Sequence, residues 1–390
     1  MKKMNVIDLF SGVGGFSKGF QQANNKIILA NEIDTSIAKS YKLNHPNTIM
    51  INEDIKIFAQ NIKDKISFEL TSLDEELKEE YIKDLNNIDV IIGGPPCQGF
   101  SMAGKRIRKN KDFIEDPRNY LFKYYYEVLK YFEPEFFVFE NVQGLLTSKN
   151  GDILREILKI FESEYSFENG GYNVDYQVVD SSSFGIPQKR KRLLIVGSKS
   201  FKIDIKKELE RYKVPDTVTL KEAISDLNYL KTGEGEFESK YKNKTLSNYQ
   251  KERRRNTNKL YNHVAPVHNE KILRKMAMIK PGENYKNLPE IEKTKSVHSG
   301  AYGRLEWTKP AYTITTRFDT PSAGRVIHPE LNRALTAREA ARIQSFDDDF
   351  KFIGNKTSIG KQIGNAVPPL LGKIIAEILN KKLEETNARD

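Results

Sequence analysis

The sequence predicts an α/β fold with a doubly wound, mostly parallel sheet and a smaller, irregular second domain. Up to about residue 200, five short apolar runs are each followed by a segment with helical spacing of apolar residues. This alternation favours parallel strands because each helix crosses over to begin the next strand in the same direction. After about residue 200 the alternation stops. Ligands of doubly wound sheets bind beyond the carboxyl ends of the strands, so residues that follow each apolar run are candidates for a site.

The composition is typical of a soluble globular protein. Hydrophobic residues make up 38% and charged residues 30% of the sequence. A length of 390 residues is enough for two domains with a substantial core. A single cysteine excludes a disulfide framework and a cysteine-rich zinc site, and we expect no metal. There is no opening segment of signal-peptide type and no apolar run long enough to span a bilayer, so we expect a cytoplasmic monomer without membrane contact. The net charge of +10 suits a polyanionic partner, although charge alone identifies none.

The first unit has the layout of a nucleotide-type cofactor site. Residues 5–10 predict a strand, residues 11–16 form a glycine-rich turn, and residues 17–24 predict a helix. Small glycine turns also join strands to helices without any ligand, so this signal is weak by itself.

Acidic residues end the next two predicted strands. Residues 27–32 end in Glu32, about twenty residues after the glycine turn, as expected for a carboxylate that binds ribose hydroxyls. Residues 48–51 lead to Asp54 and Ile55, which can accept from a base amino group and pack on its ring. Either acid can instead be a helix cap.

The only cysteine lies in a stiff loop. After a predicted acidic surface helix at 71–86, the apolar run 89–92 leads to residues 93–101, Gly-Gly-Pro-Pro-Cys-Gln-Gly-Phe-Ser. Two glycines and two prolines after a strand force a sharp turn that presents Cys97 at the strand's carboxyl end. A lone cysteine is usually a small core residue, but these neighbours do not suit a core strand. We therefore take Cys97 as a candidate nucleophile.

Basic residues follow at two places. Residues 105–111 hold five basic residues in seven positions, which form either a solvated loop or a clamp on phosphates. After a core helix at 120–132, the strand 136–139 ends at Glu140. A helix at 152–165 and strands at 174–179 and 193–197 follow, and Arg190 and Arg192 lie between the two strands.

Five candidate residues share one predicted edge of the sheet. They are Gly12, Glu32, Asp54, Cys97 and Glu140. Because carboxyl ends of parallel strands meet at one edge, their coincidence is a stronger signal than any one of them.

The chain changes character in its second half. Residues 231–262 are polar and basic, and residues 309–317 predict a strand and a turn. Thr336 and Glu339 form a predicted capping box at the start of a helix, and the chain closes with an amphipathic helix to about residue 382.

A thiol, a carboxylic acid and two arginines beside a nucleotide-type pocket suit chemistry on a pyrimidine. A thiolate that adds to ring carbon 6 breaks aromaticity and makes carbon 5 nucleophilic. An acid near ring nitrogen 3 and a guanidinium at the carbonyl oxygen would stabilise the developing charge. Carbon 5 can then attack an electrophilic methyl group.

With these residues in this order, the chain resembles the DNA (cytosine-5) methyltransferases of the prokaryotic restriction-modification type. The matching blocks occur in the family's order and span nearly the whole chain: residues 8–15, 94–101, 140–142, 188–192, 338–346 and 364–369. The resemblance implies a Rossmann-like, S-adenosylmethionine-dependent enzyme that methylates cytosine in a specific double-stranded DNA sequence through a cysteine adduct to a flipped base. It also implies a role in protecting host DNA, with a separately acting restriction endonuclease as a candidate partner.

The resemblance also assigns residues and domains. Cys97 would be the nucleophile, Glu140 would contact ring nitrogen 3 and the amine, Arg192 the carbonyl oxygen, and Arg190 would support the site or a phosphate. The implied cofactor pocket is lined by Phe10, Gly12, Gly15, Glu32, Ile33, Asp54, Ile55, Pro95, Leu121 and Asn365. The implied domains are a catalytic domain at 1–200, a target-recognition domain at 201–330, and a hinge helix with a return to the catalytic domain at 331–390.

Several alternatives compete with this interpretation. A nicotinamide dehydrogenase would explain the first strand, the turn and the acid, but not the loop with Cys97, the arginine pair or the net charge. An inactive DNA-binding relative is disfavoured because Cys97, Glu140 and both arginines occur together. An RNA cytosine methyltransferase of similar fold is the third, and the long second region argues for duplex DNA only weakly. Individual residues also have alternatives: Arg190 and Arg192 can be part of a surface charge run, and Asn365 can be a turn residue.

Overall fold

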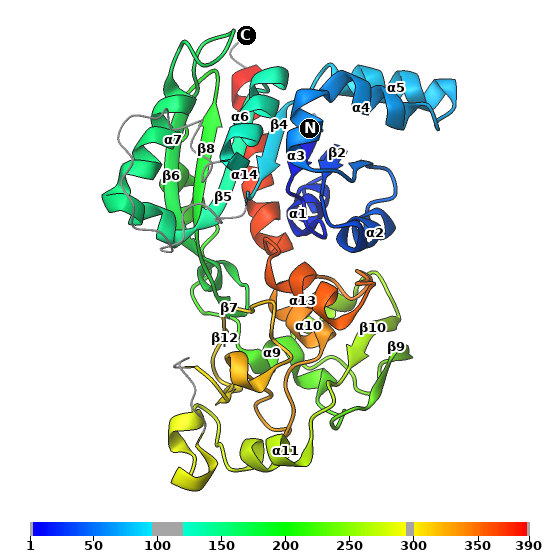
Figure 1. Cartoon of the computed structure of the whole chain (residues 1–390), viewed down its shortest axis with the longest axis vertical. Helices are drawn as coiled ribbons and strands as arrows, with labels where there is room; N and C mark the ends of the chain where they lie inside the picture. Colours follow the sequence, from blue (N-terminus) through cyan, green and yellow to red (C-terminus); the bar gives the residue numbers. More distant parts are fainter. Residues whose placement is uncertain (1–2, 96–119, 294–299, 388–390) are drawn as a thin grey trace.

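The computed structural model describes residues 3–95, 120–293 and 300–387. Figure 1 shows a sheet-containing part above and a second part below it, with α14 returning to the sheet. The strands are β1 (Asn5–Leu9), β2 (Lys26–Asn31), β3 (Ile49–Ile51), β4 (Val90–Gly93), β5 (Phe136–Val142), β6 (Asn173–Asp180), β7 (Gln188–Lys189), β8 (Lys191–Ser198), β9 (Gly235–Lys240), β10 (Lys259–Val264), β11 (Gly303–Arg304), β12 (Ala311–Tyr312) and β13 (Arg325–Ile327). The α-helices are α1 (Gly15–Gln22), α2 (Thr35–Asn44), α3 (Ile55–Gln60), α4 (Ile62–Leu70), α5 (Glu75–Leu85), α6 (Tyr120–Phe132), α7 (Asp152–Glu162), α8 (Ile205–Glu210), α9 (Leu220–Ile224), α10 (Asn248–Arg254), α11 (Glu270–Ala277), α12 (Ala337–Ile343), α13 (Lys356–Gly364) and α14 (Pro369–Asn387).

The central sheet confirms the predicted fold class. Its seven strands lie in the order β3-β2-β1-β4-β5-β8-β6. The pairs from β3 to β5 are parallel, whereas β8 runs antiparallel to both β5 and β6. The strand order reverses at β1, so β1 and β4 open a crevice at their carboxyl ends.

Both faces of the sheet are covered. On β1, Ile7 and Leu9 belong to one apolar cluster and Val6 to another, and on β5 Phe137 and Val138 divide in the same way. Successive side chains of a strand point to opposite faces, so a strand buried on both faces is apolar throughout. α14 covers one face of the sheet and packs closely on α1. A β-carbon at Gly19 of α1 would lie 2.4 Å from the Pro369 carbonyl oxygen, so glycine allows this close approach.

Most element boundaries differ from the sequence prediction by a few residues, and three of these differences have a clear physical reason. β5 continues through Glu140 to Val142, because its pairing with β8 extends as far as Val142 opposite Arg192. Glu140 therefore lies within a strand and not beyond its end. α1 begins at Gly15, two residues earlier than predicted, and α5 begins only at Glu75, since the Asp74 carboxylate caps it by accepting from the Leu77 N–H.

The lower part of the molecule, residues 215–364, holds short elements around its own core. β9 and β10 form an antiparallel pair, and α12 packs against β10 and α9. α12 begins with the predicted capping box, in which Thr336 and Glu339 satisfy each other's backbone N–H groups. No helix in the described part of the chain is both long and apolar enough to cross a membrane.

Candidate active site

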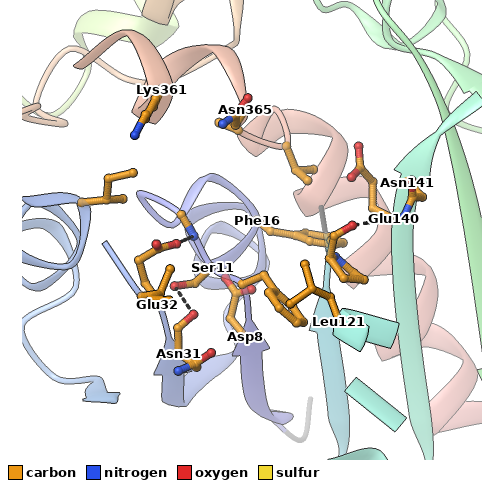
Figure 2. A pocket seen from close by; sticks show the side chains of 18 of the residues that line it. Asp8, Ser11, Phe16, Asn31, Glu32, Leu121, Glu140, Asn141, Lys361 and Asn365 are labelled. Atoms are coloured by element: carbon orange, nitrogen blue, oxygen red, sulfur yellow. Dashed lines mark hydrogen bonds between the residues drawn. The ribbon is translucent and has the colours of Figure 1, made fainter. Parts of the chain in front are cut away.

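A cavity of about 530 Å³ opens where the carboxyl ends of β1, β2, β4 and β5 approach α13. Figure 2 shows Lys361 of α13 and Asn365, the residue after this helix, on one side of it, opposite Asp8, Asn31 and Leu121. The residues that line it are Asp8, Phe10, Ser11, Gly12, Phe16, Asn31, Glu32, Ile33, Ile37, Asp54, Ile55, Gly94, Pro95, Leu121, Glu140, Asn141, Val142, Arg190, Arg192, Lys361, Gln362, Asn365, Ala366 and Val367.

The glycine turn shapes the floor of the cavity. Phe10 and Gly12 both have φ of +55°, in the left-handed region that glycine adopts without strain and phenylalanine rarely does. The Ser11 N–H donates to the Asn31 carbonyl oxygen at 2.9 Å, and the Gly12 N–H donates to Glu32 Oε2 at 3.0 Å. A β-carbon at Gly12 would touch nothing within 4 Å, so this backbone faces open space. The turn therefore ties β1 to β2 and leaves its surface free for a ligand.

Glu32 and Asp54 play different structural roles. Glu32 caps no helix: its carboxylate accepts from the N–H groups of Gly12 and Asp34, and Asp34 itself caps α2. Burial raises the pKa of Glu32 above its usual value, and these two hydrogen bonds act against that rise. Asp54 is the N-cap of α3, because its Oδ1 accepts from the Lys56 N–H at 2.8 Å. The alternative considered from the sequence, a helix cap, is therefore correct for Asp54. Both carboxylates also line the cavity.

The wall opposite the sheet comes from α13 and the residues after it. Lys361 and Asn365 lie one helical turn apart, so both side chains reach the cavity. Lys361 Nζ lies 3.6 Å from an Asp34 carboxylate oxygen, and the hydroxyls of Ser36 and Ser358 lie 2.9 Å apart. These contacts join α2 to α13 across the mouth of the cavity.

An acid–guanidinium pair stands at the other end of the cavity. Arg192 Nε lies 3.0 Å from Glu140 Oε1, and both side chains are largely buried. A β-carbon at Gly94 would lie 2.9 Å from Glu140 Oε2, so a larger residue there would force this carboxylate to shift. Asn141 Nδ2 donates to the Pro95 carbonyl oxygen at 3.2 Å. The same strand thus holds the acid and the start of the loop that carries Cys97.

Arg190 lies beneath this pair. Its side chain is 2% exposed, and Nη1 donates to the carbonyl oxygens of Gly364 at 3.1 Å and Ile314 at 3.4 Å. Burial, and next the charge of Arg192, lower the pKa of Arg190 to about 9, and Glu140 acts in the opposite direction. The guanidinium therefore joins the residue between β7 and β8 to the last residue of α13 and to Ile314.

Two buried glutamines continue this connection. Gln188 Nε2 donates to Gln344 Oε1 at 2.7 Å, and Gln188 Oε1 accepts from the Ile314 N–H at 2.6 Å. Gln344 Nε2 donates to the Ile363 carbonyl oxygen at 2.7 Å. Residue 314 of the lower part is therefore hydrogen-bonded on both sides to the segment that carries the two arginines.

The structure brings most of the predicted site residues to one cavity. One described position, Gly15, is not part of its lining. A β-carbon there would meet the Val367 carbonyl oxygen at 2.4 Å, so glycine allows the lining segment to approach α1. Cys97 and the basic run at 105–111 lie outside the described residues.

The sequence analysis missed several lining residues. Lys361 and Gln362 precede Asn365 by four and three residues, so helical spacing would have found them. Asp8, an acid inside the first apolar run, carried a signal that we did not use. Asn141 was noted only as a neighbour of Glu140.

Comparisons with known proteins agree with this geometry. The family described as C-5 cytosine-specific DNA methylase matches residues 4–381. The type II methyltransferase M.DdeI of Desulfomicrobium norvegicum is 36% identical over 406 residues, which cover 98% of this chain and 90% of the relative. The type II methyltransferase M1.HphI of Haemophilus parahaemolyticus is 35% identical, with 97% and 87% coverage.

Solved structures resemble the chain over its whole length. The crystal structure of a protein assigned as a DNA modification methyltransferase, encoded within a prophage (E. coli), has a TM-score of 0.72 at 28% identity and covers 98% of this chain and 100% of its own. The S. pombe Dnmt2 methyltransferase shares the fold, with a TM-score of 0.60 at 18% identity and coverage of 99% and 100%. The chain belongs to the C-5 cytosine-specific DNA methylases and is a DNA (cytosine-5-)-methyltransferase.

Proposed function

We propose that the chain transfers a methyl group from S-adenosylmethionine to carbon 5 of a flipped cytosine in a specific double-stranded DNA sequence, through a covalent Cys97 adduct. The observation that carries this proposal is the Glu140–Arg192 pair at the end of the cavity where the loop towards Cys97 begins. A stacked base hides its ring carbon 6 from a thiolate, so the target base must leave the duplex.

The residues at this end have complementary tasks in the proposed reaction. The Cys97 thiolate would form a bond to carbon 6, while the Glu140 carboxyl donates a hydrogen bond or proton at ring nitrogen 3. The Arg192 guanidinium would stabilise negative charge on the carbonyl oxygen, and Arg190 would hold Arg192 and the Asn365 loop in position. After methyl transfer, loss of the carbon 5 proton and of the thiolate would restore the aromatic ring.

The cavity fits S-adenosylmethionine in size and chemistry, and the cofactor would supply the electrophilic methyl group. A volume of about 530 Å³ lies within the range of small-molecule pockets. Glu32 would bind the ribose hydroxyls, and Asp54 the adenine amino group. Apolar contacts would come from Phe10, Ile33, Ile55, Pro95 and Leu121, and Asn365 and the open backbone at Gly12 would bind polar groups of the amino-acid tail. Gly15 would act through packing of the lining segment.

The rest of the chain would serve DNA binding. We propose residues 1–200 as the catalytic domain, 201–330 as the target-recognition domain, and 331–390 as the hinge helix and return. The basic run at 105–111 would bind DNA phosphates. Since the curated relatives are type II methyltransferases, we propose that this cytoplasmic monomer protects host DNA, with a restriction endonuclease that acts separately.

The covalent step is tested with duplex DNA that carries 5-fluorocytosine at the target. Fluorine blocks the final elimination, so the wild-type enzyme with cofactor should remain attached to the DNA on a denaturing gel. Cys97→Ser should bind the same DNA without forming this complex, and an adduct with the serine variant would exclude Cys97 as the nucleophile. Arg155→Met, an exposed change far from the cavity lining, serves as the matched control that traps normally.

The target is found by expressing the protein in a methylation-free host and sequencing the bisulfite-treated DNA. We expect full protection of one cytosine within one DNA sequence. Labelled-methyl transfer to transfer RNA, but not to duplex DNA, would contradict the proposed substrate.

A further inference from the structure

Asp8 is a buried acid for which the proposed reaction has no task. It lies in β1, is 1% exposed, and lines the cavity. Figure 2 shows Asp8 on the sheet side of the cavity, between Ser11 and Leu121. A carboxylate removed from water loses much favourable solvation, so its place in the wall of a ligand cavity needs a physical reason.

The hydrogen bonds around Asp8 favour its ionised form. The Ser17 hydroxyl donates to Asp8 Oδ2 at 2.6 Å, and the Ser17 and Tyr41 hydroxyl oxygens lie 2.7 Å apart. Because the one hydroxyl hydrogen of Ser17 is used towards Asp8, the Tyr41 hydroxyl donates to Ser17. Two hydroxyl dipoles therefore point in sequence towards the carboxylate, and each strengthens the next.

No cation in the described part of the chain forms an ion pair with this carboxylate. Its charged neighbour is another acid, Glu32, on β2. Tyr41 of α2 and Tyr125 of α6 face it as neutral hydroxyls, since burial raises the pKa of both well above 10. β4 contributes no titratable side chain.

The positive side chains of the cavity are engaged elsewhere. Arg192 pairs with Glu140, Lys361 lies beside Asp34, and Arg190 donates to carbonyl oxygens. Burial raises the pKa of Asp8 to about 7, and the hydrogen bonds from Ser17 limit that rise. The carboxylate is thus poised to gain from a positive charge brought into the cavity.

We propose that Asp8 supplies the countercharge by which this pocket prefers a cationic methyl donor to its neutral product. The inference rests on the proposed function and names a specificity-determining residue for it. S-adenosylmethionine carries a sulfonium charge that S-adenosylhomocysteine lacks, because the methyl group leaves as a cation equivalent and the C–S bonding electrons remain on sulfur. In a cavity of low dielectric, one carboxylate can distinguish the two ligands through space. The product is then the weaker ligand and leaves.

Two consequences follow for binding. Ionised Asp8 favours the charged ligand, whereas protonated Asp8 treats both ligands alike. The preference should therefore be strong at pH 8 and weak at pH 6, on either side of the Asp8 pKa of about 7. Binding of the cation should also release a proton near neutral pH.

The test measures Kd by titration calorimetry for S-adenosylmethionine, S-adenosylhomocysteine and sinefungin, in which a protonated amine replaces the methylated sulfonium. For the wild-type protein, we divide the Kd of S-adenosylhomocysteine by the Kd of a cationic ligand. This ratio should fall about tenfold from pH 8 to pH 6 for both S-adenosylmethionine and sinefungin. Asp8→Asn keeps the size of the side chain, and its ratio should be no higher than the wild-type ratio at pH 6 and should not change between the two pH values.

Two further variants make the outcome independent of the folding of Asp8→Asn. Ser17→Ala removes a donor to the carboxylate and should move the midpoint of the wild-type pH change upwards. Glu32→Gln, at the other acid of the same cavity, should weaken all three ligands and, because the Glu32 charge raises the pKa of Asp8, move the midpoint of the pH change downwards without abolishing that change. A wild-type ratio that does not change with pH, or that Asp8→Asn preserves, would overturn the inference. If none of the three ligands bound to the wild-type protein, the proposed function itself would fail.

Discussion

The sheet and the lower part of the molecule bury different kinds of side chain. In the sheet, Phe136, Phe137 and Phe139 of β5 are fully buried among other apolar residues. In the lower part, three fully buried arginines hold the elements together: Arg333 binds the Glu339 carboxylate with two nitrogens, Arg338 donates to three backbone carbonyls, and Arg342 bridges two aspartates.

This difference follows from the regularity of the backbone. Strands in a sheet satisfy one another's N–H and C=O groups, so their side chains can be apolar. The irregular chain of the lower part leaves carbonyl groups inside, and long cationic side chains satisfy several of them at once. We infer that the sheet is held mainly by apolar area, whereas the lower part depends, besides its own apolar core, on a small number of charged hydrogen bonds that are costly to break.

The largest effect is expected for Arg342→Met. Arg342 donates to Asp226 at 2.6 Å and to both oxygens of Asp348 at 2.9 and 2.6 Å, so the variant leaves two carboxylates buried without this cation. Loss of one partner of a buried ion pair costs about 3–5 kcal/mol. Urea unfolding is followed by fluorescence of Trp307, the only tryptophan, which packs on the lower core.

The control for this prediction is the exposed pair of Arg155 and Asp152, whose side chains are 66% and 64% exposed. Arg155→Met should change stability by less than about 1 kcal/mol. An Arg342→Met protein with the wild-type urea midpoint would show that the lower part does not depend on its buried charges.

A smaller effect is expected at the connection between the two parts. Gln188→Met keeps the side-chain length but leaves the Ile314 N–H and Gln344 Oε1 without their Gln188 partners. A buried polar group left unsatisfied costs about 1–3 kcal/mol. Because Gln188 and Arg190 hold opposite sides of Ile314, methyl transfer should also slow while cofactor affinity stays within about twofold.

Single-turnover rates and cofactor Kd measured on the same preparation test this point. Gln177→Met is the matched control, since Gln177 lies on β6 and its side chain donates to the carbonyl oxygen of the adjacent Val178, not to a distant segment. An equal slowing of methyl transfer in both variants would contradict a specific role of Gln188 in the connection to Ile314.

The smallest effect, counted for one histidine and one pH unit, concerns pH. Burial lowers the pKa of His263 to about 4 and that of His328 to about 3, so both stay neutral in the folded lower part. In the unfolded chain they bind protons below about pH 6.5. Their contribution to stability is therefore complete above pH 6.5 and is lost as the pH falls towards 4, by up to about 1.4 kcal/mol per pH unit for each histidine.

The sheet should respond less to the same change of pH. Burial lowers the pKa of His45 to about 3, but it raises that of Asp8 to about 7, and an acid with a raised pKa gains stability as the pH falls from 7 towards 4. The two contributions oppose each other. Urea midpoints from Trp307 fluorescence between pH 5 and 7 should have a shallower slope in His263→Gln than in wild type, and equal slopes would contradict the histidine origin.

The sequence by itself determined what depends on near neighbours. The alternation of strand and helix, the glycine turn after β1 and the capping box of Thr336 and Glu339 are all present as predicted, because each depends on residues a few positions apart. Glu32, Asp54 and Glu140 were found because parallel strands bring their carboxyl ends to one edge, which strand order alone fixes.

Only the tertiary structure decided which distant residues complete the site. α13 meets α2 at the cavity more than 300 positions after Gly12, and nothing near Lys361 in the sequence indicates its contact with Asp34. The burial of Asp8 with no ion-paired cation among the described residues, and the contact of Gln188 with Ile314, likewise depend on segments that the chain brings together only when packed. Local patterns fix backbone conformation, whereas the solvation and charge of a side chain are set by whatever packs around it.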